Sequence, residues 1–61
     1  MWYIMTCTEE NWFNDEMEAR QAAREAARAE GQAAHVYEWD HVADPSCREV
    51  FDKDPIGIYG V

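Results

Sequence analysis

The sequence has few of the residues that cross-link a chain or anchor it in a membrane. Its 61 residues include two cysteines, two prolines and three glycines. Cys7 and Cys47 are too few for a disulfide framework, and we expect both to be thiols in a reducing compartment. No segment approaches the roughly 18 apolar residues of a membrane span, and residues 1–5 lack the basic start of a secretory signal. These absences favour a cytoplasmic protein.

Basic residues are scarce as well. Five lysines and arginines stand against thirteen acidic residues, which gives a formal net charge of -8. Such a charge repels phosphate backbones and anionic lipids, so direct binding to nucleic acid or to a membrane is disfavoured. The same charge suits a partner protein with a basic surface, such as an enzyme that holds DNA or RNA, and speeds the encounter at low salt.

The chain also lacks the motifs of calcium loops, phosphate-binding loops and dinucleotide folds. The potential zinc ligands are Cys7, His35, His41 and Cys47. Their spacing does not give the close ligand pairs of structural zinc modules. The residue types of a nucleophile, a base and an orienting carboxylate occur at His41, Asp44, Ser46 and Cys47. These residues flank a predicted turn on a chain too small to enclose a water-free pocket, so we expect no enzymatic activity. From the missing motifs and the ligand spacing we expect no metal and no cofactor.

Aromatic residues, in contrast, are abundant. The aromatic residues are Trp2, Tyr3, Trp12, Phe13, Tyr37, Trp39, Phe51 and Tyr59. Each can bury on the order of 150–250 Å², which is more than a core of this size needs. We therefore expect some of them to face a partner protein or a second copy of the chain.

The first residues of the chain predict a strand and a hairpin arm. Residues 2–7 are rich in aromatic and bulky apolar types that follow no helical stripe, which is typical of a buried strand. Polar residues 8–11 then predict a turn. Trp12 and Phe13 are expected to pair back on the first strand as a short arm.

A helix is predicted from about residue 14 to residue 30, with Asn14 as its N-cap and Gly31 as the residue that ends it. The alanines that share one face are Ala19, Ala22, Ala23, Ala26 and Ala29. We expect the first four of these to be buried, because small side chains let a helix lie close on a sheet. The basic residues on the opposite face are Arg20, Arg24 and Arg28. These are expected to be solvated.

The second half of the chain predicts a hairpin. Residues 35–42 alternate as a strand does, with Tyr37 and Trp39 directed toward the core and Glu38 and Asp40 directed outward. Residues 43–46 predict a turn, and residues 47–52 a returning strand. Residues 56–61 form either a docked tail or a short edge strand.

These elements predict a single domain of the α+β class. One helix packs on a small three- to four-stranded, mainly antiparallel sheet, in the order β-α-β-β or ββαββ. No linker, internal repeat or low-complexity segment divides the 61 residues.

Acidic residues gather in two tracts, one before the helix and one after it. From these tracts we select the carboxylates most suited to contact a basic partner. The candidate partner-binding residues are Glu9, Glu10, Glu38, Asp40, Asp52 and Asp54. Glu38 and Asp40 are of particular interest, since a strand places them about 6.5–7 Å apart, close to twice the phosphate spacing of one DNA strand.

The predicted elements follow one another in this order: a strand, an acidic turn, a helix opening with N-D-E, the segment V-Y-E-W-D, a D-P-S turn and the segment R-E-V-F-D. This order resembles that of small acidic bacteriophage inhibitors. Anti-CRISPR proteins and phage inhibitors of host RNA polymerase are of this kind. The resemblance is one of architecture across most of the chain. It implies a viral inhibitor that acts in the host cytoplasm by occluding a basic nucleic-acid-binding surface. The alternative is a self-assembling structural or adaptor module, a homodimer joined through exposed aromatic residues or the apolar tail.

Overall fold

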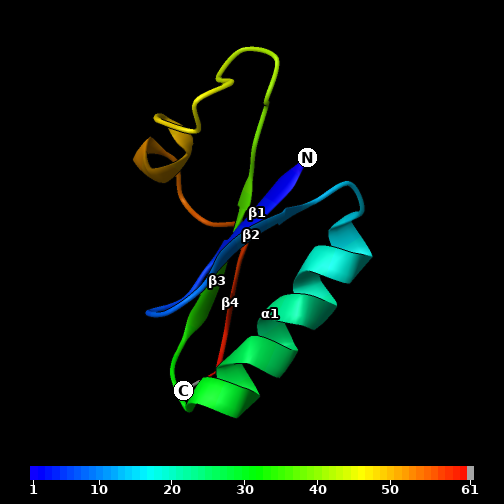
Figure 1. Ribbon diagram of the computed structural model, residues 1–61, viewed down its shortest axis with the longest axis vertical. Coiled ribbons are helices and arrows are strands. Elements are labelled where there is room, and N and C mark those ends of the chain that lie inside the picture. The colour runs from blue at the N-terminus through cyan, green and yellow to red at the C-terminus, as the bar shows by residue number, and fades with distance from the viewer. Residues whose placement is uncertain (61) are drawn as a thin grey trace.

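The computed structural model describes residues 1–60 of the chain. In chain order the elements are β1 (Trp2–Met5), β2 (Glu10–Phe13), α1 (Glu16–Glu30), β3 (Ala34–Glu38), the 3-10 turn η1 (Val50–Asp52) and β4 (Gly57–Tyr59). Within these residues the strands form one antiparallel sheet in the order β2-β1-β3-β4. The helix α1 lies on one face of this sheet, as Figure 1 shows. The predicted α+β fold is confirmed.

The N-terminal hairpin forms as predicted, although its first strand is shorter. β1 ends at Met5, and Tyr3 lies opposite Trp12 in the ladder between β1 and β2. The strand ends there because the Thr6 hydroxyl accepts hydrogen bonds from the backbone N–H groups of Thr8 and Glu9, at 3.2 and 2.9 Å. A side-chain oxygen that satisfies the backbone in this way replaces the ladder with a turn.

The helix begins one residue later than predicted. Its N-cap is Asp15 rather than Asn14, since Asp15 has extended dihedral angles and its Oδ2 accepts from the N–H of Glu18 at 3.0 Å. The predicted end is confirmed. Gly31 adopts φ 69°, in the left-handed region that suits glycine, and its N–H donates to the Ala27 carbonyl at 2.8 Å.

The buried stripe of α1 differs from the predicted one by a small rotation. Ala19, Ala23 and Ala27 are at most 5% exposed, whereas Ala22 and Ala26 are only half-buried. The buried alanines repeat at steps of four, so they follow a line along the helix that lies over β1 and β3. The prediction that Ala22 and Ala26 are buried is therefore wrong, because both are only half-buried and lie on the open side of the helix next to β2.

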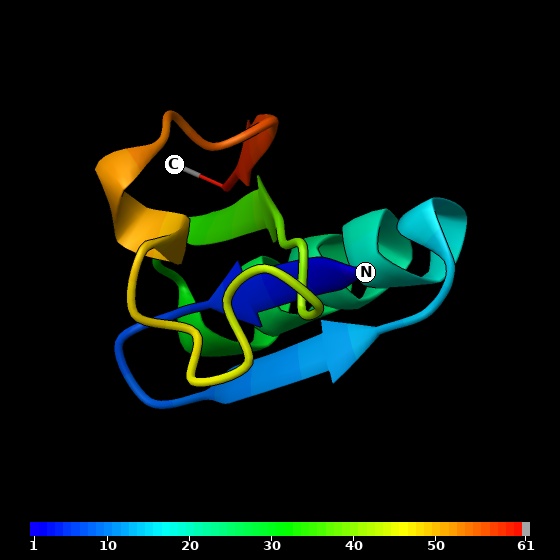
Figure 2. The same ribbon diagram turned by 90° about the horizontal axis from the view of Figure 1, so that it is seen from above.

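The aromatic residues pack mainly on the face of the sheet away from α1. Tyr37 and Trp39 are 7% and 8% exposed, which confirms that they belong to the core. Their neighbours in this cluster are Tyr3 and Val50. Figures 1 and 2 show η1 and α1 on opposite sides of the sheet. The helix face has small and aliphatic residues at its centre, such as the fully buried Val36, and the partly buried rings of Trp2, Phe13 and Tyr59 pack against them.

The predicted hairpin of residues 35–52 does not form. β3 ends at Glu38, and Asp40 Oδ1 accepts hydrogen bonds from the N–H groups of Val42 and Ala43, at 3.1 and 3.3 Å. This side-chain bonding builds a turn at the point where the strand was expected to continue. His41 and Val42 are consequently exposed.

Residues 47–52 form a loop and the 3-10 turn η1 rather than a returning strand. The Asp44 carboxylate accepts from the N–H groups of Arg48 and Glu49, at 3.0 and 2.9 Å, which uses donors that a strand would need. Cys47 has φ 55°, a left-handed conformation that a strand does not contain. The segment is fixed to the sheet by Trp39, whose Nε1 donates to the Asp44 carbonyl at 2.8 Å.

The arginine stripe of α1 is not simply solvated. Arg20 Nη1 donates to the Tyr59 hydroxyl at 2.8 Å, and the Arg24 guanidinium lies 5.1 Å from the centre of the Tyr59 ring. Of the three arginines in the stripe, only Arg28 is exposed without such a contact to another side chain in residues 1–60. Tyr59 belongs to β4, so the C-terminal segment is an edge strand, one of the two predicted alternatives; its last residue, Val61, lies outside the described residues.

Across residues 1–60, α1 is the helix of greatest length, and no helix there is long and apolar enough to cross a bilayer.

Candidate functional site

The acidic side chains lie on the surface almost without basic partners. No charged residue among residues 1–60 is buried. One ion pair occurs in this part of the chain, between Arg20 and Glu16 at 3.5 Å. The remaining carboxylates therefore project a negative field that this chain does not neutralise itself.

Glu9 and Glu10 lie at the N-terminal hairpin. The Tyr3 hydroxyl donates to Glu10 Oε2 at 2.7 Å, which holds this carboxylate against the sheet. Burial of the phenol, and then its bond to Glu10, raise the pKa of Tyr3 above its usual range. Tyr3 thus keeps its proton and remains a donor, so the Glu10 carboxylate has a fixed position rather than a range of them.

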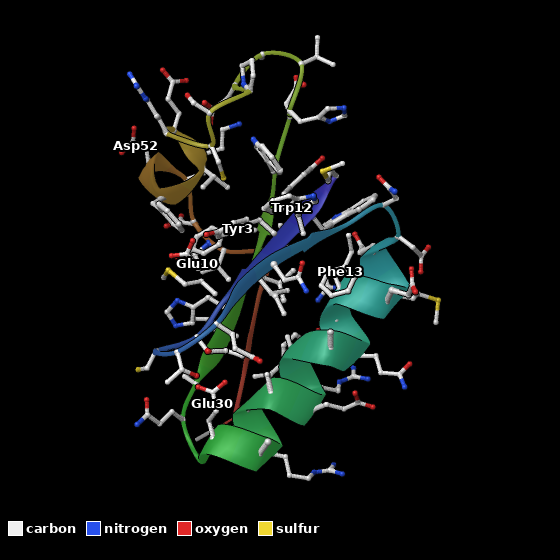
Figure 3. The ribbon with its side chains drawn as sticks, in the orientation of Figure 1. Tyr3, Glu10, Trp12, Phe13, Glu30 and Asp52 are labelled. Carbon is white, nitrogen blue, oxygen red and sulfur yellow. The ribbon has the colours of Figure 1, made fainter. Side chains whose placement is uncertain are left out.

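A groove of about 540 Å³ separates the hairpin from α1. Its apolar lining comes from Ile4, Phe13, Ala22, Ala26 and Ala29. Its rim carries the acidic side chains of Glu9 and Glu25, and Glu10 of β2 also borders it, although the Glu10 carboxylate lies on the other face of the sheet beside Tyr3. The groove exists because the apolar residues on this side of the helix are alanines, and their methyl groups do not reach β2. Figure 3 shows Phe13 between β2 and α1, at one end of this space.

Trp12 lies on the other side of β2 and is the most exposed tryptophan, at 57%. Its ring meets Trp39 edge to face, with centroids 5.9 Å apart. Its backbone N–H donates to the side-chain Oδ1 of the preceding residue, Asn11, at 2.9 Å. A tryptophan held in this way is a rigid, half-desolvated surface of the kind found at protein interfaces.

Glu38 and Asp40 lie at the opposite end of the molecule from the hairpin turn. They line a hollow of about 450 Å³ together with Trp39, His41 and Lys53. Lys53 weakens the negative field there. The Oδ1 atom of Asp40 accepts the hydrogen bonds from Val42 and Ala43 that build the turn, although the Asp40 side chain remains exposed.

The six candidate carboxylates do not form one site. The hairpin pair borders the groove, and the Glu38 and Asp40 pair borders the distal hollow. Asp52 and Asp54 are exposed on residues 44–54, the covering segment, whose Val50 packs on the aromatic face of the sheet. Figure 3 shows Asp52 on the outer side of η1. The charge is therefore spread over the molecule. Along the sequence, residues 1–19 contain five acidic residues and no lysine or arginine.

The groups considered for catalysis or metal binding are dispersed or engaged. Within residues 1–60 no three His, Cys, Asp or Glu side chains are arranged to hold a metal ion. Asp44 bonds to backbone N–H groups rather than to His41. Burial, and then the nearby Asp44 carboxylate, raise the pKa of Cys47, which makes its thiol a poor nucleophile at neutral pH.

Comparison with protein-family models, with curated proteins and with solved structures gives no match, so function has to be inferred from the chain's own geometry. Two features of that geometry were not predicted from the sequence, namely the groove beside β2 and the exposure of Trp12. The half-buried alanines Ala22 and Ala26 carried a signal for the groove, since a helix side built from alanine leaves space wherever no large residue fills it.

Proposed function

We propose that this chain is an acidic protein-binding module that covers a basic, nucleic-acid-binding surface of another protein and so inhibits it. The observation that carries the proposal is the surface charge: residues 1–60 contain one ion pair, so nearly all carboxylates keep a negative charge that no basic side chain of these residues neutralises and that a partner's basic residues can meet. Fixed carboxylates such as Glu10 take the places of phosphates, and the exposed ring of Trp12 adds an apolar anchor.

The test is competition with nucleic acid. The immobilised chain is used to capture proteins from a bacterial lysate at low and at high salt, and bound proteins are eluted with duplex DNA or RNA. The expected result is capture at low salt, release by nucleic acid and loss at high salt, because screening weakens exposed charge pairs. Captured proteins that resist both nucleic acid and salt would contradict the proposal.

Two pairs of charge reversals test where the contact lies. One variant combines Glu9→Lys with Glu25→Lys on the groove rim, and the other combines Glu38→Lys with Asp40→Lys at the distal hollow. Both change the net charge equally, so each is the matched control of the other. We expect both to weaken binding and the rim variant to weaken it more, because Lys53 already offsets part of the distal charge. Unchanged binding in both variants would refute a charge-driven contact.

The self-assembling module has one observation in its favour. Ile58, on the edge strand β4, is 60% exposed, and exposed apolar residues on an edge strand favour pairing between copies. Sedimentation at several concentrations distinguishes the two functions. A monomer supports the inhibitor, and a dimer abolished by Ile58→Lys supports the module.

A further inference from the structure

The outer edge of β2 is open to pairing with another chain. β2 is an edge strand of the sheet. Along β1, hydrogen-bonded pairs alternate between its two neighbours. The Thr6 N–H donates to Glu9 of the hairpin and the Trp39 N–H donates to Met1, so even residues of β1 bond toward β2 and odd residues toward β3.

This alternation fixes the direction of the β2 backbone. Glu10 and Trp12 lie opposite the odd residues Met5 and Tyr3, so their N–H and C=O groups point away from β1 and out of the sheet. The Trp12 N–H is met there by the Asn11 side chain rather than by a strand. Asn11 Oδ1 thus stands where the carbonyl of an added strand would lie.

An added strand would meet different surfaces on its two faces. Side chains on one face would enter the groove over Ala22 and Ala26, which calls for apolar residues. Side chains on the other face would lie beside Trp12 and the fixed carboxylate of Glu10, which calls for lysine or arginine. Successive residues of a strand alternate between faces, so the edge fits a segment in which apolar and basic residues alternate.

A second copy of this chain fits the edge poorly. Each copy carries a charge of -8, and the segment before Arg20 contains no basic residue to offer to the acidic rim of the other copy. The basic residues nearest in sequence, Arg20 and Arg24, are already engaged with Tyr59 at the other edge of the sheet. Charge complementarity therefore selects a different, basic protein as the occupant.

We infer that the outer edge of β2 is a strand-addition site, where an extended segment of alternating apolar and basic residues from the partner protein pairs antiparallel with Glu10–Phe13. The segment displaces the Asn11 side chain from the Trp12 N–H, places apolar side chains in the groove and sets basic side chains on Trp12 and Glu10. This inference rests on the proposed function in taking a basic protein as partner, and it names the contact that such a partner makes.

The probe is a short synthetic peptide of alternating lysine and valine. In antiparallel pairing the residue directly opposite Trp12 shares its face, so lysine N–H groups point toward β2 and valine N–H groups point away. N-methylation of the lysine amides should weaken binding about tenfold or more, as expected for the loss of two hydrogen bonds. N-methylation of the valine amides should leave the affinity unchanged. Equal affinities, or a loss with valine methylation alone, would overturn the inference.

Variants of the chain test the groove independently. Ala26→Leu fills the groove without changing charge, and we expect it to weaken the peptide severalfold, whereas Ala43→Leu on the exposed distal loop should not. Asn11→Ala removes the competing acceptor and should tighten binding while the amide proton of Trp12 becomes protected from exchange by the peptide. Wild-type affinity in the Ala26 variant, with circular dichroism showing a folded chain, would refute the site.

Failure of this site can be told apart from failure of the proposed function. If the peptide does not bind at low salt while nucleic acid still releases captured proteins, strand addition is wrong and the inhibitor stands. If the peptide binds with the expected methylation pattern and no captured protein responds to nucleic acid, the site stands and inhibition by occlusion is wrong.

Discussion

Thr6 is predicted to hold the N-terminal hairpin to the end of α1, and its replacement by valine tests this. The Thr6 hydroxyl accepts from the N–H groups of Thr8 and Glu9 and donates to Glu30 Oε2, the last bond being 2.9 Å long. Glu30 Oε1 is buried and has no hydrogen-bond partner within residues 1–60. Thr6→Val keeps the shape of the side chain and removes all three bonds.

The expected cost can be worked out from these bonds. Water can replace the hydroxyl at the exposed N–H groups, so each of those bonds contributes less than the usual net value of about 1 kcal/mol. The Glu30 carboxylate, with one oxygen already unpaired, then loses its remaining donor, which costs about 1–3 kcal/mol. A loss of about 2–3 kcal/mol is large, because a chain of this length has a free energy of unfolding of roughly 3–9 kcal/mol.

The measurement is thermal and urea unfolding followed by circular dichroism. At about 4–8 °C per kcal/mol for a domain of this size, Tm should fall by roughly 10–20 °C. Thr8→Val is the matched control, since Thr8 is exposed and its hydroxyl makes no hydrogen bond within residues 1–60; it should change stability by less than about 0.5 kcal/mol. The reasoning is refuted if Thr6→Val is as stable as the control, or if Thr6→Val costs as much in a Glu30→Ala background as in the wild type.

Three further predictions follow from single groups. The pKa of Tyr3 is raised in the folded chain, so the unfolded chain releases the phenol proton at lower pH than the folded chain does. Tyr3 therefore contributes stability that is lost as pH rises above about 10, and Tyr3→Phe should flatten this alkaline decline in urea titrations. Cys7 is exposed, whereas Cys47 is half-buried with a raised pKa, so iodoacetamide followed by mass spectrometry should modify Cys7 first, and faster labelling of Cys47 would show that the covering segment opens. Asp44→Ala removes the acceptor of two backbone N–H groups, so it should lower the free energy of unfolding by about 1–2 kcal/mol and make the Trp39 ring more accessible to fluorescence quenchers. An unchanged emission and Tm would show that Asp44 does not order residues 44–50.

The parts of the fold that local patterns determine were predictable from the sequence. Gly31 ends the helix through a conformation that glycine favours over other residues, and the alternation around Tyr37 and Trp39 identified two core residues. The N-cap was misplaced by one residue because Asn14 and Asp15 are both good caps, and only the geometry of the preceding arm chooses between them.

What could not be predicted depends on contacts distant in sequence. Residues 47–52 have the composition of a strand, but Asp44 binds the N–H groups that a ladder would use, and the Trp39 indole bonds to the Asp44 carbonyl. Val50 then packs on the aromatic face of the sheet, against Tyr3, Tyr37 and Trp39. Glu38 lies far from the hairpin carboxylates because the register of β3 on β1 places it opposite Trp2, whereas the hairpin turn follows Met5. The pattern of charge along the chain therefore did not reveal which charges share a surface.

Charge and edge geometry act together at β2. An exposed edge strand with an apolar groove beside it invites pairing between copies of a chain, and proteins commonly prevent this by placing charge along the edge. Here Glu9 and Glu25 flank the groove, Glu10 lies on the other face of the edge beside Tyr3, and Asn11 covers the Trp12 N–H. Repulsion between two such edges opposes self-pairing, whereas the same carboxylates attract a basic strand. A single set of side chains therefore excludes one occupant and selects the other, which is why replacing Glu9 and Glu25 by lysine should both weaken a basic peptide and raise the tendency of the chain to self-associate, as sedimentation would show.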